Sequence, residues 1–74
     1  MSPIPNHKEL LEKYPLDQLE NWFAKIEKNG YIVSADIHQC QIYDEIGNLF
    51  IDADFFDDYH LNAAMAIYEF FYGD

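Results

Sequence analysis

The residues best suited to chemistry stand at alternate positions near the middle of the chain: Asp36, His38 and Cys40. Alternate residues of a regular strand share one face, so a carboxylate, an imidazole and a thiol would form one row. These groups can bind zinc, and His60 or Asp52 could complete a four-coordinate site. The alternative is an ordinary strand face on which Cys40 packs as a small hydrophobic side chain. A zinc site around His38 and Cys40 is therefore a minor hypothesis, and we expect no metal and no cofactor.

The same three residues do not form a plausible nucleophilic catalyst. Side chains two positions apart along a strand lie roughly 6.5 to 7 Å apart, which is too far for the hydrogen bond between a nucleophile and its base. The three glycines form no G-x-G arrangement, so no phosphate-binding loop is visible. The aspartates between positions 52 and 58 resemble a calcium loop only loosely, because Asp57 stands where such a loop needs glycine. We expect a protein that is not an enzyme.

Charge is distributed very unevenly along the chain. There are 14 acidic residues, four lysines and no arginine, which gives a formal net charge of -10. All four lysines precede residue 29, where five acidic residues nearly balance them, and residues 29–74 contain nine acidic residues and no lysine or arginine. Such a field repels nucleic acids and anionic membranes and attracts basic surfaces. We expect neither direct nucleic-acid binding nor membrane binding.

The acidic residues of this second part are interspersed with aromatic ones. Carboxylates pair with lysine and arginine of a partner, and aromatic rings fill the apolar gaps of an interface. The expected partner is a basic protein surface, such as the cleft of a nuclease or another nucleic-acid-binding protein. The alternative is a solvated surface that serves only solubility. The predicted partner-binding residues are Asp44, Glu45, Asp52, Asp54, Phe55, Asp57, Asp58 and Tyr59.

In size, charge and lack of catalytic signatures, the chain is similar to the small acidic inhibitors that phages and mobile elements use against restriction or CRISPR nucleases. Some of those inhibitors imitate DNA. This similarity lies in composition. It implies an inhibitor or nucleic-acid mimic that occupies a basic cleft.

Two helices are expected before residue 31. Asn6 followed by Glu9 is a start signal resembling a capping box for a helix over about 7 to 13, and Pro15 requires that helix to end near residue 14. A second helix ends at the Asn29-Gly30 pair. Its predicted apolar stripe consists of Leu16, Leu19, Trp22, Phe23 and Ile26.

The middle of the chain has the alternation of β-strands. Apolar and polar residues alternate from Tyr31 to His38, and the phase then shifts at Cys40 and Ile42, which predicts a break near Gln39. A polar turn over residues 44–48 precedes a returning strand over 49–53. We expect an antiparallel hairpin, with a third short strand as an open alternative.

The last predicted helix, over about 57 to 71, is apolar nearly all round. Such a helix is either central in its own fold or covered by a partner. We predict that Tyr68, Phe71 and Tyr72 contact a partner helix or a second copy of the chain, as in a homodimer. The alternative function is therefore a homo-oligomeric adaptor or structural interaction domain.

Size and cysteine usage complete the expectations. With 74 residues, half of them hydrophobic and 18% aromatic, residues 1–74 are expected to form a single α+β domain in the order α-α-β-β-α. One cysteine excludes an internal disulfide and favours a reducing compartment, so we expect a cytoplasmic protein. No signal sequence or membrane-spanning stretch is expected.

Overall fold

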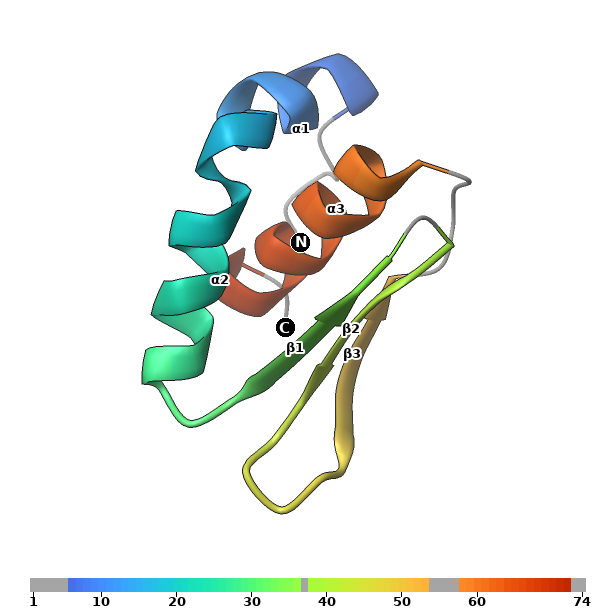
Figure 1. The fold of residues 1–74 in the computed structure, drawn as a ribbon. Coiled ribbons are helices and arrows are strands. Elements are labelled where there is room, and N and C mark those ends of the chain that lie inside the picture. The colour runs from blue at the N-terminus through green and yellow to red at the C-terminus, as the bar shows by residue number, and fades with distance from the viewer. Residues whose placement is uncertain (1–5, 37, 54–57, 73–74) are drawn as a thin grey trace.

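Helices pack on one face of a three-stranded sheet in the computed structural model (Figure 1). The structure describes residues 6–36, 38–53 and 58–72. Its helices are α1 (His7–Lys13), α2 (Leu19–Lys28) and α3 (Tyr59–Tyr72). The strands β1 (Ile32–Ala35), β2 (Cys40–Tyr43) and β3 (Leu49–Ala53) pair antiparallel in the order β1-β2-β3. The predicted α+β class is confirmed, and the sheet contains the third strand that the sequence left open.

The first two helices begin and end largely where the sequence signals stand. The Asn6 Oδ1 accepts a hydrogen bond of 2.8 Å from the backbone N–H of Glu9, and Gly30 follows α2 with φ at 94°. Leu16 is a correction, because it is 59% exposed instead of lying on the apolar stripe. It belongs to a 3-10 turn over Leu16–Gln18 that precedes α2. That turn has about 3.0 residues per turn, so its side chains fall out of phase with the α-helix.

The predicted first strand is too long at its carboxyl end. β1 stops at Ala35, and Asp36 opens the turn that leads to β2. The Asp36 Oδ1 accepts hydrogen bonds from the backbone N–H groups of His38 at 2.8 Å and Gln39 at 3.0 Å. This local side-chain bonding competes with strand pairing. The predicted break near Gln39 is therefore confirmed as the turn between β1 and β2.

The inner face of the sheet is defined by its register. Ile42 pairs with Val33 on one side and Ile51 on the other, and Cys40 pairs with Ala35 and Ala53 in the same way. Directly opposed residues share a face. Since Cys40, Ile42 and Ala53 are buried, this face carries the strands' part of the core.

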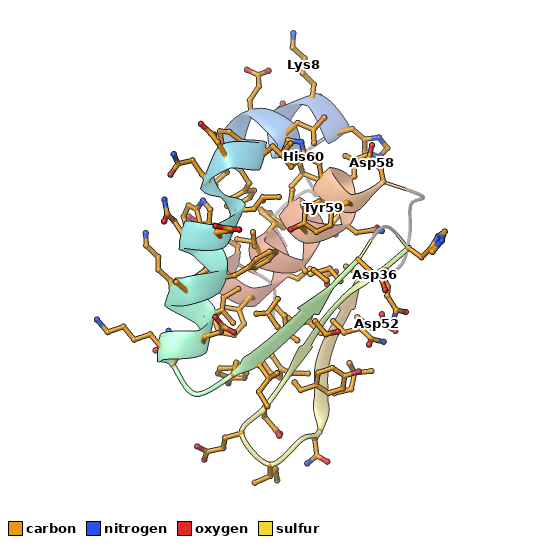
Figure 2. The ribbon with its side chains drawn as sticks, in the orientation of Figure 1. Lys8, Asp36, Asp52, Asp58, Tyr59 and His60 are labelled. Carbon is orange, nitrogen blue, oxygen red and sulfur yellow. The ribbon has the colours of Figure 1, made fainter. Side chains whose placement is uncertain are left out.

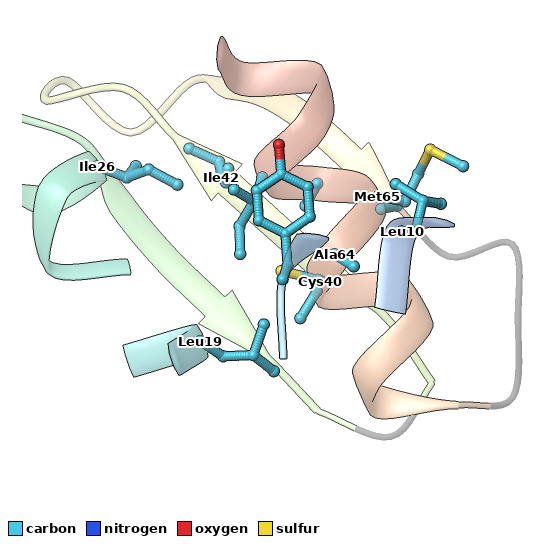
Figure 3. Close-up of a cluster of buried hydrophobic side chains, with 12 residues drawn as sticks. Leu10, Leu19, Ile26, Cys40, Ile42, Ala64 and Met65 are labelled. Carbon is cyan, nitrogen blue, oxygen red and sulfur yellow. The ribbon is translucent and has the colours of Figure 1, made fainter. Parts of the chain in front are cut away.

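Helix α3 is the centre of the fold. It contacts α1 and α2 as well as β2 and β3, and all six residues from Asn62 to Ile67 are buried. Figure 3 shows its Ala64 among core side chains from the N-terminal segments and from β2. The breadth of its apolar surface is thus explained by neighbours within the chain. Asn62 is a polar residue of this helix, and the structure nevertheless buries it completely.

Tyr14 and His60 tie the beginning of α3 to the end of α1. The His60 Nε2 donates a hydrogen bond of 2.6 Å to the backbone carbonyl of Tyr14, 46 positions away in the sequence.

The Tyr14 ring is completely buried and packs edge-on against Trp22, with 5.1 Å between centroids. From Trp22, ring contacts continue through Phe71 and Phe70 to Tyr31 and Phe50. Aromatic side chains thus supply much of the packing that a short chain needs.

Candidate functional site

The structure does not bring Asp36, His38 and Cys40 together as one row. Cys40 lies on the inner face of the sheet, and burial, together with the nearby charge of Asp36, raises the pKa of its thiol to about 12. His38 is exposed in the turn. His60, the proposed fourth ligand, donates its Nε2 proton to a carbonyl. Among residues 6–36, 38–53 and 58–72, no three His, Cys, Asp or Glu side chains are grouped to hold a metal ion.

The outer face of the sheet carries exposed apolar side chains. The helices pack on the opposite side of the sheet (Figure 1). Tyr43 on the central strand pairs with Ile32 on β1 and Leu49 on β3. These three residues, called here the apolar row, therefore cross the whole sheet on its outer face. Ile32 is 51% exposed and Leu49 is 52% exposed, so the described part of the chain leaves the row open to a partner.

Carboxylates stand at both ends of the outer face. Asp44 and Glu45 follow Tyr43 at the β2–β3 turn, whereas Asp52 is in register with Gln41 in the next row. Asp36 follows β1 at the same end as Asp52, and Figure 2 shows both along one side of the molecule. No lysine or arginine occurs after Lys28 in the sequence. The apolar row thus lies between two acidic ends.

Some of these carboxylates also shape the backbone. The Asp44 Oδ1 accepts hydrogen bonds from the backbone N–H groups of Ile46 at 3.0 Å and Asn48 at 2.9 Å, which fixes the turn. The Asp58 Oδ1 accepts one of 3.0 Å from the N–H of Leu61, near the start of α3. Each keeps a second carboxylate oxygen and its charge. Glu45 and Asp52 are therefore the better probes of partner binding, because changing them removes none of these hydrogen bonds.

The five predicted partner-binding residues that the structure describes divide into three groups. Asp44 and Asp52 lie around the open sheet face, with the Glu45 carboxylate beside Gly30 at one end of it, while Asp58 lies near the start of α3. Tyr59 lies apart from them and points toward α2 (Figure 2). Burial is the main cause that raises the pKa of its hydroxyl, with the charges of Cys40 and Glu20 adding to it. Outside the described residues lie Asp54, Phe55 and Asp57.

Sequence reasoning missed Ile32 and Leu49. Ile32 alternates with Tyr31 and Val33, and that alternation places it on the face opposite the core. Sequence alternation is a weaker guide to the face on which Leu49 lies, because the strand register shifts next to it. Ile42 pairs with Ile51 and Tyr43 with Leu49, which leaves Phe50 as the extra residue of a bulge.

The predicted interface residues of α3 already make some packing contacts within the chain. Tyr68 is half-buried, and its ring lies 5.4 Å from that of Tyr72. The Phe71 ring packs at 5.4 Å from Trp22, and the Lys13 Nζ lies 4.2 Å from the centre of the Tyr72 ring. Phe71 nevertheless stays 38% exposed and Tyr72 55% exposed. This second aromatic surface is thus partly covered by contacts within the chain.

Among the helices that the structure describes, none has the length and hydropathy of a membrane span. No family model, curated protein or solved structure matches the chain. What its surfaces can bind therefore follows from their own chemistry.

Proposed function

We propose that this chain is a protein-binding domain that docks on a basic protein surface through the open face of its sheet. The observation that carries the proposal is the apolar row, Ile32, Tyr43 and Leu49, set between carboxylates with no basic residue in the sheet. An apolar centre with a polar, charged rim is the usual composition of an interface. A surface that served solubility alone would have no need of exposed isoleucine and leucine in register.

The partner follows from the sign of the charge. A cleft that normally binds a polyanion offers lysine and arginine side chains to which carboxylates can bind in place of phosphates. The net charge of -10 would also speed the encounter with such a cleft. By occupying it the chain would exclude nucleic acid and act as an inhibitor or nucleic-acid mimic, with no catalytic step of its own.

The charge-removing variant Glu45→Gln with Asp52→Asn tests the proposal. Both changes keep side-chain size, and we expect about tenfold weaker partner binding at low salt, from two ion pairs of about 0.7 kcal/mol each. The matched control, Glu12→Gln with Asp17→Asn, removes the same charge from exposed positions near α1 and should bind like the wild type. Proteins captured from a lysate by the wild type are identified by mass spectrometry, and their affinities for all three proteins are measured by surface plasmon resonance.

Salt and competition provide the second half of this test. The wild-type affinity should fall as salt shortens the Debye length to about 8 Å, and added DNA should compete for the partner. Equal binding by the variant and the control, at low and at high salt, would show that the acidic face serves solvation only.

The exposed aromatic end of α3 favours self-association as a second candidate function. A dimer that buries Phe71 and Tyr72 should form at high protein concentration, and Tyr72→Ser should weaken it. Leu16→Ser removes an apolar side chain of similar exposure elsewhere and should leave the dimer intact. Sedimentation equilibrium measures the association, and a wild-type protein that stays monomeric throughout would eliminate this candidate.

A further inference from the structure

An open groove of about 330 Å³ lies between α2 and β1, separate from the outer face of the sheet. In Figure 1, α2 and β1 meet at the turn that contains Gly30 and diverge from it. The groove therefore has a helix as one wall and a strand as the other. Its lining consists of Glu20, Phe23 and Glu27 from α2, Val33 and Ala35 from β1, and Tyr59 from α3.

Among the strands that the structure describes, none pairs with the edge of β1 that forms the strand wall of the groove. The backbone N–H of Asp36 donates to the carbonyl of Gln39 at 2.8 Å, which makes Ala35 and Cys40 a pair without mutual hydrogen bonds. Because the two kinds of pair alternate, Ser34 exchanges hydrogen bonds with β2, whereas Val33 and Ala35 do not. The N–H and C=O groups of Val33 and Ala35 consequently point away from β2. They offer two donors and two acceptors along the groove.

The two edges of the sheet differ in their protection. Natural proteins protect sheet edges with charges, prolines and bulges. β3 has two of these features, the bulge at Phe50 and the charge of Asp52. β1 has the sequence Ile-Val-Ser-Ala and has none of them. β1 is therefore the edge available for pairing with another chain.

We propose that this groove binds an extended, basic segment of a partner protein as an additional antiparallel strand beside β1. Strand addition to a free edge is a recurring way of binding peptides, in which backbone hydrogen bonds supply affinity and side-chain pockets supply specificity. The proposal concerns a different surface from the open sheet face and does not rest on it.

The charge of the helix wall determines the occupant. Glu20 and Glu27 are seven residues apart on α2, about 10.5 Å along the helix axis. Alternate residues of an added strand repeat at about 6.8 Å, so two long basic side chains on one face of it can reach the two carboxylates. Their aliphatic stems would cover Phe23. A second copy of this chain is disfavoured, because it would bring the same glutamates toward each other.

The probe is the peptide acetyl-Val-Lys-Val-Lys-Val-Lys-amide, whose lysines share one face when it is extended. Titrated into isotopically labelled protein at low salt, it should give saturable NMR shifts at the amides of Val33 and Ala35. It should also slow the hydrogen exchange of both amides, because they gain acceptors. No saturable binding up to about 1 mM, the range of the weakest specific complexes, would overturn the proposal.

Backbone methylation separates strand addition from charge attraction. Lysines opposite Val33 and Ala35 must direct their own backbone N–H groups at β1. Methylating the backbone nitrogens of the lysines should therefore weaken binding about tenfold, the effect of two hydrogen bonds of about 0.7 kcal/mol each. Methylating the valine nitrogens leaves charge and composition the same and should change little. Equal affinities of the two methylated peptides would show that no strand is added.

The protein variants complete the test. Glu20→Gln with Glu27→Gln should weaken peptide binding about fivefold, the effect of two exposed ion pairs. The control Glu12→Gln with Asp17→Asn should have no effect. If the variant with both Glu20 and Glu27 replaced bound the peptide as tightly as the wild type, the two glutamates would not select a basic segment. Glu45→Gln with Asp52→Asn should also leave peptide binding unchanged. An experiment that contradicts the proposed groove can therefore be distinguished from one that contradicts the proposed interface on the open sheet face.

Discussion

The free energy of unfolding should fall by roughly 3 kcal/mol between pH 9 and pH 12 through Cys40 alone. Burial, with a smaller contribution from Asp36, raises the pKa of this thiol from its ordinary 9.0 to about 12. The folded protein therefore holds the proton more tightly than the unfolded chain does. This stability is fully present below pH 9 and is lost as the pH rises toward 12. A chain of 74 residues has little stability in reserve, so the loss takes a large share of it.

Tyr14 adds to the same alkaline loss. Burial, followed by the neighbouring Tyr72 and Tyr68, raises the pKa of its hydroxyl from 10.0 to about 12. This buried hydroxyl has no hydrogen-bond partner among the described residues. Its contribution to the free energy of unfolding is lost over a narrower range, from pH 10 upward. In Tyr14→Phe, the free energy of unfolding should therefore fall less steeply with pH above pH 10.

Urea unfolding at intervals from about pH 8 to about pH 12 measures the effect. Cys40→Ala should be less stable than the wild type at the lowest pH, because it leaves a small cavity, but its stability should fall less as the pH rises. The native thiol should also resist thiol reagents at neutral pH, since the thiolate is the reactive form. If the wild type and Cys40→Ala lost stability in parallel, the burial of Cys40 would not be the cause.

The sequence predicts those parts of the fold that depend on local chemistry. Asn6 and Glu9 mark the start of α1, and Gly30 follows the end of α2, because capping uses residues close together in the chain. The alternation around Val33 predicts a strand for the same reason. Leu16 shows the limit of this reasoning, since one 3-10 turn changes the helical phase and exposes a residue that the periodicity counts as core.

Contacts that depend on tertiary packing were less predictable. Asn62 is polar, yet it lies on a helix surrounded by α1, α2 and the sheet, so it is buried with its apolar neighbours. The width of the apolar stripe on α3 allowed either a central helix or one covered by a partner. The packing of α1, α2, β2 and β3 against α3 decides for the central position.

The candidate site shows the same division. Composition identifies the acidic character, and the turn places Asp44 and Glu45 together because they are neighbours in the sequence. The apolar row requires the register of three strands, including the bulge at Phe50, and no local pattern specifies that register. Tyr59 follows Asp58 in the sequence, but the rotation of the helix directs it toward the α2 groove instead.

Replacing Ile32 and Leu49 of the apolar row should have the largest effect on partner binding. The variant Ile32→Thr with Leu49→Thr places β-branched threonine at both strand positions, which suits their extended backbone. Both native side chains are about half exposed, so the folded protein should lose little stability. In a complex each would bury its remaining apolar surface, at about 1 kcal/mol per side chain. We therefore expect binding to weaken about thirtyfold.

Salt dependence distinguishes this loss from that of the charge variant. Burial of apolar surface is not screened, so the deficit of the threonine variant should persist at high salt, whereas that of Glu45→Gln with Asp52→Asn should shrink. Leu16→Thr, which removes a similarly exposed side chain from the 3-10 turn, should bind like the wild type. If the double threonine variant also kept full affinity for the partner, the sheet face would not be the interface. The exposed Phe71 and Tyr72 at the end of α3 would then be the next candidates for it.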